Sequence, residues 1–215
     1  MFKKPVVIVF IGYVGAGKTT HILAAFNDLK KRGYKVHKTY VRTIFFTTML
    51  LSKLRLLQGA IRRFAVALDL LLNSILLPVV LWLRVMLFPL ITKKQVVLVE
   101  EHLLGSLVDY IQPDLKPIVL PALKILFRLS IVSMWSGIIY VFCDKELLPQ
   151  RWAKRRTPPE SNIYLLVQDL VFTILLKNLN NDILRIDTSI EFNHNKHKVE
   201  EFILRKLKSQ IKICS

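Results

Sequence analysis

The sequence predicts a single α/β domain of three layers, in which helices cover both faces of a five-stranded parallel sheet. Along the 215 residues, short apolar runs alternate with longer segments of helical periodicity. This alternation is typical of parallel strands joined by crossover helices. No internal repeat or linker divides residues 1–215, and this length suits one full hydrophobic core. The predicted strands are residues 6–11, 34–40, 96–101, 138–143 and 182–187.

The first predicted strand leads directly into a glycine-rich segment, GYVGAGKTT, that precedes a helical pattern. Its glycines, lysine and threonine have the Walker A spacing G-x-x-x-x-G-K-[ST], in which backbone N–H groups surround a phosphate chain. Lys18 would reach the β- and γ-phosphates, and the Thr19 hydroxyl would bind Mg²⁺. The positive end of the following helix adds to the same site. We therefore expect a P-loop NTPase fold that binds ATP and Mg²⁺ through Gly12, Tyr13, Val14, Gly15, Ala16, Gly17, Lys18, Thr19 and Thr20.

An acidic pair ends the third predicted strand. The run VVLVEE consists of four apolar residues followed by Glu100 and Glu101. A carboxylate at the carboxyl end of a strand, beside a phosphate loop, is where Mg²⁺ or its water ligands need an acceptor. Many buried strands end in a solvated glutamate, so this pattern alone does not indicate a metal site. It does so here because the glycine motif precedes it in the chain. Either Glu100 or Glu101 could serve the metal.

An apolar helical insertion at about 44–92 interrupts the α/β pattern. Its segment 66–91 contains only Asp69 and Arg84 as charged residues and reaches the length of a membrane span. Those charges and two prolines oppose a clean span. Three alternatives remain open. The segment forms a pair of core helices jointed near Pro78, packed on the sheet or in a homodimer interface; it inserts peripherally into an anionic membrane surface; or it crosses the membrane.

The charge balance is strongly basic. Thirty-two Lys and Arg against fifteen Asp and Glu give a net charge of +17, which favours phosphate-rich partners. The cations are scattered and no nucleic-acid-binding motif is present, so we predict no specific nucleic-acid partner. We expect a cytoplasmic protein without disulfides, with peripheral association at the inner face of the membrane as an alternative.

The two cysteines, Cys143 and Cys214, do not have the spacing of a metal or redox site. Cys143 is expected to be a buried small hydrophobic residue. His194 and His197 fall in a predicted polar loop. Without a third ligand, we predict that they are surface residues.

A cationic arm at about 145–160 follows the fourth predicted strand. It contains Arg151, Lys154, Arg155 and Arg156 and ends at a Thr-Pro-Pro sequence. Such a run is usually a solvated helix face. Beside a phosphate loop, it can also close over a nucleotide and neutralise charge during transfer.

With these motifs in place, the chain resembles the thymidylate kinase family of P-loop nucleoside monophosphate kinases. The family's phosphate-loop pattern F-E-G-x-D-G-x-G-K-[ST]-[ST] matches residues 10–20, except that Ile11 and Val14 replace the acidic residues. The family's arginine after the second strand, which binds the acceptor phosphate, matches Arg42. The LID segment resembles residues 142–156.

Two further family segments have weaker counterparts. The loop near the donor nucleobase corresponds to Asp187, Thr188 and Ser189. The D-R-Y-x-x-S-x-x-A-Y signature is echoed by Glu101, His102, Leu103, Ser106, Asp109 and Tyr110. Its D-R pair is therefore Glu101-His102 here.

The resemblance implies an ATP- and Mg²⁺-dependent kinase that transfers the γ-phosphoryl group to a nucleoside monophosphate such as dTMP. It implies catalytic roles for Lys18, Arg42, Glu101, Arg151 and Arg155, and places Arg156 and Thr188 with the bound ATP. Because the family's acidic residues are replaced, two alternatives stay open. One is a membrane-associated kinase with a lipid-linked or other apolar acceptor, and the other is a non-catalytic NTP-binding protein.

Overall fold

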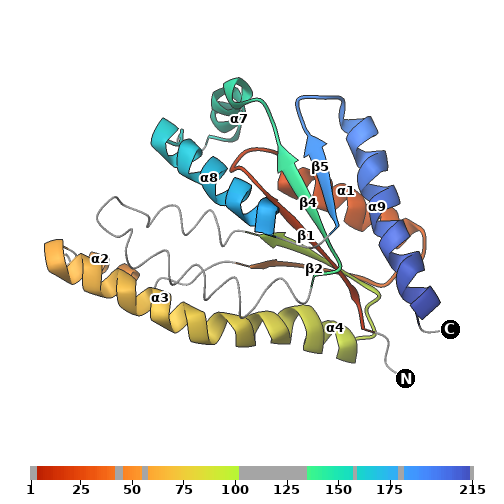
Figure 1. The fold of residues 1–215 in the computed structure, drawn as a ribbon, viewed down its shortest axis with the longest axis horizontal. Coiled ribbons are helices and arrows are strands. Elements are labelled where there is room, and N and C mark those ends of the chain that lie inside the picture. The colour runs from red at the N-terminus through yellow and green to blue at the C-terminus, as the bar shows by residue number, and fades with distance from the viewer. Residues whose placement is uncertain are drawn as a thin grey trace.

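A five-stranded sheet forms the centre of the computed structural model, which describes residues 4–41, 46–54, 58–101, 135–156, 159–178 and 182–213 (Figure 1). All strand pairs are parallel, in the order β2-β3-β1-β4-β5. The three-layer fold with five parallel strands is therefore confirmed, and the predicted strand ends are off by two residues at most. The strands are β1 (Val6–Gly12), β2 (Val36–Val41), β3 (Val96–Glu101), β4 (Gly137–Phe142) and β5 (Ile183–Asp187).

Helices cover both faces of this sheet. Helices α1 and α9 pack together on one face, and α8 and the long α3–α4 segment lie on the other (Figure 1). The segment 102–134, which includes the signature counterparts His102, Leu103, Ser106, Asp109 and Tyr110, lies outside the described residues, as does Arg42. The helices are α1 (Lys18–Lys31), α2 (Phe46–Lys53), α3 (Gly59–Leu81), the π-helix η1 (Trp82–Leu87), α4 (Phe88–Ile91), the 3-10 helix η5 (Lys145–Leu147), α7 (Leu148–Arg155), α8 (Asn162–Asn178) and α9 (Phe192–Ile213).

Strand β1 is the centre of the hydrophobic core. Every residue from Val6 to Ile11 is completely buried, because β3 and β4 flank the strand and helices cover both of its faces. Strands buried on both faces need a continuous apolar run rather than an alternating one, and VVIVFI is such a run. The buried Ile22, Ala25 and Leu29 of α1 join the same core.

The insertion does not have the predicted joint at Pro78. Helix α3 continues through this residue to Leu81, and a π-helix follows it before α4. The prediction was wrong because proline removes only one backbone donor, and the rest of a long helix can continue past it. The buried charge of Asp69 also has a partner, because its Oδ1 accepts a hydrogen bond from the Thr47 N–H (2.8 Å) in the first turn of α2. A carboxylate at a helix N-terminus is stabilising.

One face of α3 and η1 is apolar and exposed. We call the residues along it the apolar stripe: Ile61, Phe64, Leu71, Leu72, Leu76, Val79, Trp82 and Leu83. Successive members of the stripe are one, three, four or seven residues apart, which places them on one broad side of the helix. The opposite side is buried through Val66, Asp69, Leu81 and Val85, so the segment is neither fully core nor fully surface. Among the described helices, none has the length and hydropathy needed to cross a bilayer.

The two histidines of the C-terminal region lie on a helix rather than in a loop. Helix α9 begins at Phe192, before both His194 and His197, and both side chains are exposed as predicted. Across the described residues, no three or more His, Cys, Asp or Glu side chains gather as a metal site would require. Cys143 is buried and has a free thiol, as expected.

Two other histidines are partly or fully buried. His21 of α1 is 3% exposed, its ring lies 5.1 Å from that of Phe192, and its Nδ1 has no hydrogen-bond partner among the described residues. Burial lowers its pKa, and the charge of Arg151 lowers it further. Burial also lowers the pKa of His37 in β2, with a smaller contribution from Lys94.

These shifts predict a loss of stability in mild acid. In the unfolded chain both histidines take up protons near pH 6.5, whereas in the folded chain they do so at lower pH. The stabilising contribution is therefore complete above pH 6.5 and declines as the pH falls below it. Urea unfolding between pH 8 and pH 5 should show this decline. The decline should be smaller in His21→Asn than in the wild type, and an equal slope in the two proteins would contradict the prediction.

Candidate functional site

The candidate site lies at the edge of the sheet where the parallel strands end. Strand β1 ends there in the glycine loop, which we define as residues 12–19, and α1 begins at the end of that loop. The strand register pairs Phe10 with Glu100 of β3 and Gly12 with Val141 of β4. The carboxyl ends of three neighbouring strands are therefore brought together, the usual position of ligand sites in open α/β sheets.

Two glycines of the loop are required by close contacts. A Cβ atom on Gly12, whose φ is +147°, would lie 1.9 Å from the carbonyl oxygen of Val141. A Cβ atom on Gly15, at φ +90°, would lie 2.8 Å from Nε1 of Trp152. Only glycine combines these backbone angles with so little space. The loop is thus enclosed by β4 on one side and by α7 on the other.

The Lys18 ammonium is held against the beginning of the loop. Its Nζ donates to the carbonyl oxygens of Gly12 (2.7 Å) and Tyr13 (2.9 Å), and the residue is 6% exposed. A buried ammonium requires such acceptors. Helix α1 begins beside it after Gly17, with no side-chain cap and no acidic residue in the first turn. The positive charge of the lysine and the positive end of the helix therefore coincide, which favours an anion.

The glycine loop and β3 are joined by a short hydrogen bond. The Thr19 Oγ1 donates to Glu100 Oε1 at 2.5 Å, and Glu100 is buried. A hydroxyl and a carboxylate are hard oxygen ligands that fit Mg²⁺, which typically takes one or two carboxylates and completes its shell with phosphates and water. Of the two candidate glutamates, Glu100 is the one whose side chain makes this contact with Thr19. The Glu101 side chain lies outside the described part of the chain.

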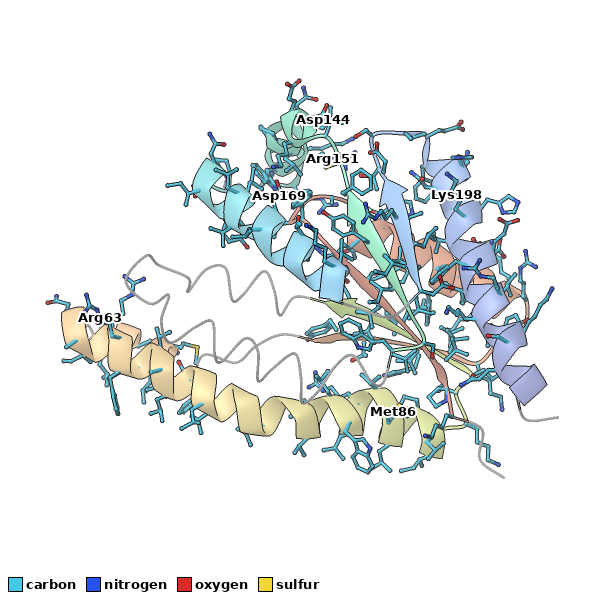
Figure 2. The ribbon with its side chains drawn as sticks, viewed as in Figure 1. Arg63, Met86, Asp144, Arg151, Asp169 and Lys198 are labelled. Carbon is cyan, nitrogen blue, oxygen red and sulfur yellow. The ribbon has the colours of Figure 1, made fainter. Side chains whose placement is uncertain are left out.

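The cationic arm reaches the far end of the glycine loop through Arg151 (Figure 2). Its guanidinium donates to Oγ1 (2.8 Å) and to the carbonyl oxygen (2.7 Å) of Thr188, which follows β5. A longer bond reaches the carbonyl oxygen of Ala16 (3.4 Å), to which the Thr188 hydroxyl also donates (2.7 Å). Arg151, Thr188 and the loop therefore form one connected group.

The remaining arginines of the arm lie apart from this group. The side chains of Arg155 and Arg156 are exposed and make no hydrogen bond or ion pair with the described residues. Arg156 ends α7 with a φ of +54°. Thr20 is also exposed, in the first turn of α1. Roles for these side chains in nucleotide binding stay predictions.

Trp152 is a residue of this site that the sequence analysis missed. It is 3% exposed and packs on Gly15, and its Nε1 donates to the carbonyl oxygen of Val14 (3.2 Å). The contact joins residues far apart in the chain, so no spacing rule reveals it. A signal was present, however, because a tryptophan within a highly cationic helix is the residue most expected to turn inward.

The loop also has an aromatic side. The ring of Tyr13 makes edge-on contacts with Tyr140 of β4 (6.4 Å between centroids) and Phe172 of α8 (5.9 Å). Burial raises the pKa of Tyr140 to about 12, so its phenol is neutral at physiological pH. Tyr13, Tyr140 and Phe172 therefore form an uncharged aromatic wall beside the loop. Asp169, in the same helix as Phe172, forms an ion pair with Lys145 that ties α8 to the arm.

Comparison with known proteins gives a structural relative but no sequence relative. No family model matches the sequence, and no curated protein matches it. The structure is similar to the crystal structure of thymidylate kinase from Ehrlichia chaffeensis, with a TM-score of 0.51 and 18% sequence identity. The similarity covers 93% of this chain and 98% of that one. Together with the parallel sheet and the glycine loop, it shows that the chain has a divergent thymidylate kinase-like P-loop fold.

Proposed function

We propose that this protein is an ATP-dependent phosphotransferase that transfers the γ-phosphoryl group of ATP to a nucleoside monophosphate. The observation that carries the proposal is the short Thr19–Glu100 contact beside the buried Lys18 ammonium. These three groups supply a cation for phosphate and two oxygen ligands for Mg²⁺ at the N-terminus of α1. Phosphoryl transfer depends mainly on positioning and charge neutralisation, and these groups are suited to both.

The donor side uses the glycine loop. Backbone N–H groups at the start of α1 and the Lys18 ammonium bind the triphosphate, while Thr19 and Glu100 hold Mg²⁺. When bound, the metal neutralises charge on the phosphate oxygens. The Arg151–Thr188 group fixes the far end of the loop, and Trp152 covers Gly15. These contacts keep the loop in one conformation before the nucleotide arrives, which lowers the entropic cost of binding.

Two observations support the proposed acceptor, namely the fold and the aromatic wall beside the glycine loop. A nucleoside monophosphate offers a phosphate to Arg42, as the family resemblance implies, and a planar base to apolar surroundings. Ile11 replaces a family carboxylate and is fully buried, and Val14 replaces the other, so neither position contributes negative charge. We propose dTMP as the first acceptor to test, because the structural relative is a thymidylate kinase.

The test of the proposed function is phosphate transfer from ATP to a panel of nucleoside monophosphates. We expect turnover with at least one of them, dTMP included in the panel, and an absolute requirement for Mg²⁺. Product formation should be followed by separating nucleoside diphosphates chromatographically. ATP binding without turnover on any monophosphate would contradict the kinase proposal.

Lys18→Ala should weaken ATP binding by about tenfold to a hundredfold, the value of a lost charge-assisted hydrogen bond. Calorimetric titration with ATP measures this change, and circular dichroism checks that the variant is folded. Lys31→Ala is the matched control, because Lys31 is exposed at the other end of the same helix. Equal ATP affinity in the Lys18 variant and the wild type would refute the site assignment.

Glu100→Gln should reduce kcat by about a hundredfold and raise the Mg²⁺ concentration needed for half-maximal activity, since a charged ligand becomes neutral at nearly constant size. Glu101→Gln, at the next position of the same strand, is the control for a general loss of charge. The structure pairs Glu100 with Thr19, so the Glu101 variant should retain most activity. The reverse ranking of the two variants would show that Glu101 serves the metal.

A further inference from the structure

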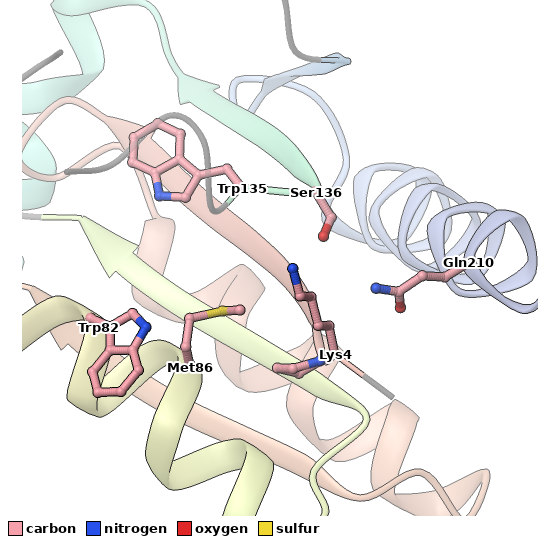
Figure 3. A pocket seen from close by; sticks show the side chains of 7 residues that line it. Lys4, Trp82, Met86, Trp135, Ser136 and Gln210 are labelled. Atoms are coloured by element: carbon pink, nitrogen blue, oxygen red, sulfur yellow. The ribbon is translucent and has the colours of Figure 1, made fainter. Parts of the chain in front are cut away.

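A cavity lies at the opposite edge of the sheet from the glycine loop. Its volume is about 360 Å³, within the range of roughly 300–1,000 Å³ typical of small-molecule sites. Lys4 and Pro5 lead into β1, and Ser136 directly precedes β4, so the cavity opens where these parallel strands begin. The other labelled side chains of its wall are Trp82, Met86, Trp135 and Gln210 (Figure 3).

The apolar part of the wall comes from the π-helix. Trp82 and Met86 are four residues apart in η1, whose wider turn brings residues four and five apart onto one side. Trp135, from the segment before β4, completes this part of the wall. Trp82 is 48% exposed and also belongs to the apolar stripe. The apolar surface of the cavity therefore continues outward along the exposed side of α3.

The polar part of the wall contains one ammonium group. The Lys4 side chain points into the space bounded by Trp135, Ser136 and Gln210 (Figure 3). Lys4 forms no ion pair or hydrogen bond with the described residues. Ser136 is held in place by its backbone N–H, which donates to Val7 O (2.8 Å), and by its Oγ, which accepts from Val7 N (3.0 Å).

We propose that this cavity binds a single-chain anionic amphiphile. Its carboxylate or phosphate head pairs with the Lys4 ammonium beside Ser136 and Gln210, and its chain packs on Trp82, Met86 and Trp135. One cation beside an apolar wall suits a single charged head, whereas a polyphosphate requires several donors. The continuous apolar surface from Trp82 along the stripe suits a chain longer than the cavity.

The cavity is separate from the phosphotransferase site, so this inference does not rest on the proposed function. The ligand could arrive as a free molecule or as a lipid of an anionic bilayer, because each source offers one anionic head and an acyl chain that can enter the cavity. The net charge of +17 favours either source by long-range attraction.

The first experiment titrates the full-length protein with dodecanoate, kept below its micelle-forming concentration, by calorimetry. Two of the three tryptophans line the cavity, so tryptophan emission gives a second readout. We expect saturable binding that is at least tenfold weaker in Lys4→Gln, equivalent to about 1.4 kcal/mol. Lys31→Gln removes an exposed lysine outside the cavity and should bind dodecanoate as the wild type does. Met86→Glu, which places a carboxylate in the wall, should abolish binding.

A second experiment distinguishes a free ligand from a bilayer lipid by sedimenting the protein with phosphatidylglycerol vesicles. Vesicle binding that is lost in both Lys4→Gln and Met86→Glu, without binding of free dodecanoate, assigns the site to a bilayer lipid. The proposal is overturned if neither probe binds, or if both variants and Lys31→Gln bind the probes as the wild type does. Lys4 is exposed, and thermal unfolding of Lys4→Gln verifies that a loss of binding is not a loss of folding.

Discussion

The hydrogen bond between the Thr19 hydroxyl and the buried Glu100 carboxylate is the constraint on which the proposed chemistry depends. It joins the first turn of α1 to the end of β3, and it forms because the register sets Glu100 beside Phe10, just before the glycine loop. A buried carboxylate needs such a partner to offset its desolvation. The same pair of oxygens is the one that a hard divalent cation prefers. In the proposed function, stability and metal binding would therefore use the same contact.

The glycine loop is held from two further directions. Gly12 allows the backbone of β4 to approach so closely that any side chain would collide with the Val141 carbonyl oxygen. At the other end, Thr188 and Arg151 are bonded to the Ala16 carbonyl oxygen. A loop fixed in this way needs little reorganisation to bind phosphate, which is the general advantage of a preorganised site. The cationic arm contributes both Arg151, which bonds to the loop, and Trp152, which covers it, so one helix holds the loop in two ways.

The two edges of the sheet have different chemistry. At the carboxyl ends of the strands, Lys18, Arg151 and Thr188 donate hydrogen bonds to backbone carbonyl oxygens of the glycine loop and its surroundings. At the amino ends, a single lysine faces tryptophan and methionine side chains supplied largely by a π-helix. Short π-helical segments often occur at functional sites, and this one interrupts a long helix at the point where its exposed face meets the cavity. The glycine loop and the cavity therefore lie at opposite ends of the strands.

The sequence by itself determined the five strands, the glycine loop and the start of α1, because these follow from patterns over a few neighbouring residues. It could not say which of Glu100 and Glu101 contacts Thr19, since that contact depends on which face of β3 meets α1. Nor could it place the buried Asp69, whose partner Thr47 lies on another helix, or Trp152, whose partner Val14 is 138 residues away. The cavity beside Lys4 combines residues from both ends of the chain and from two segments between them. Only tertiary packing decides such contacts, because they depend on strand register and on helix faces that no local pattern encodes.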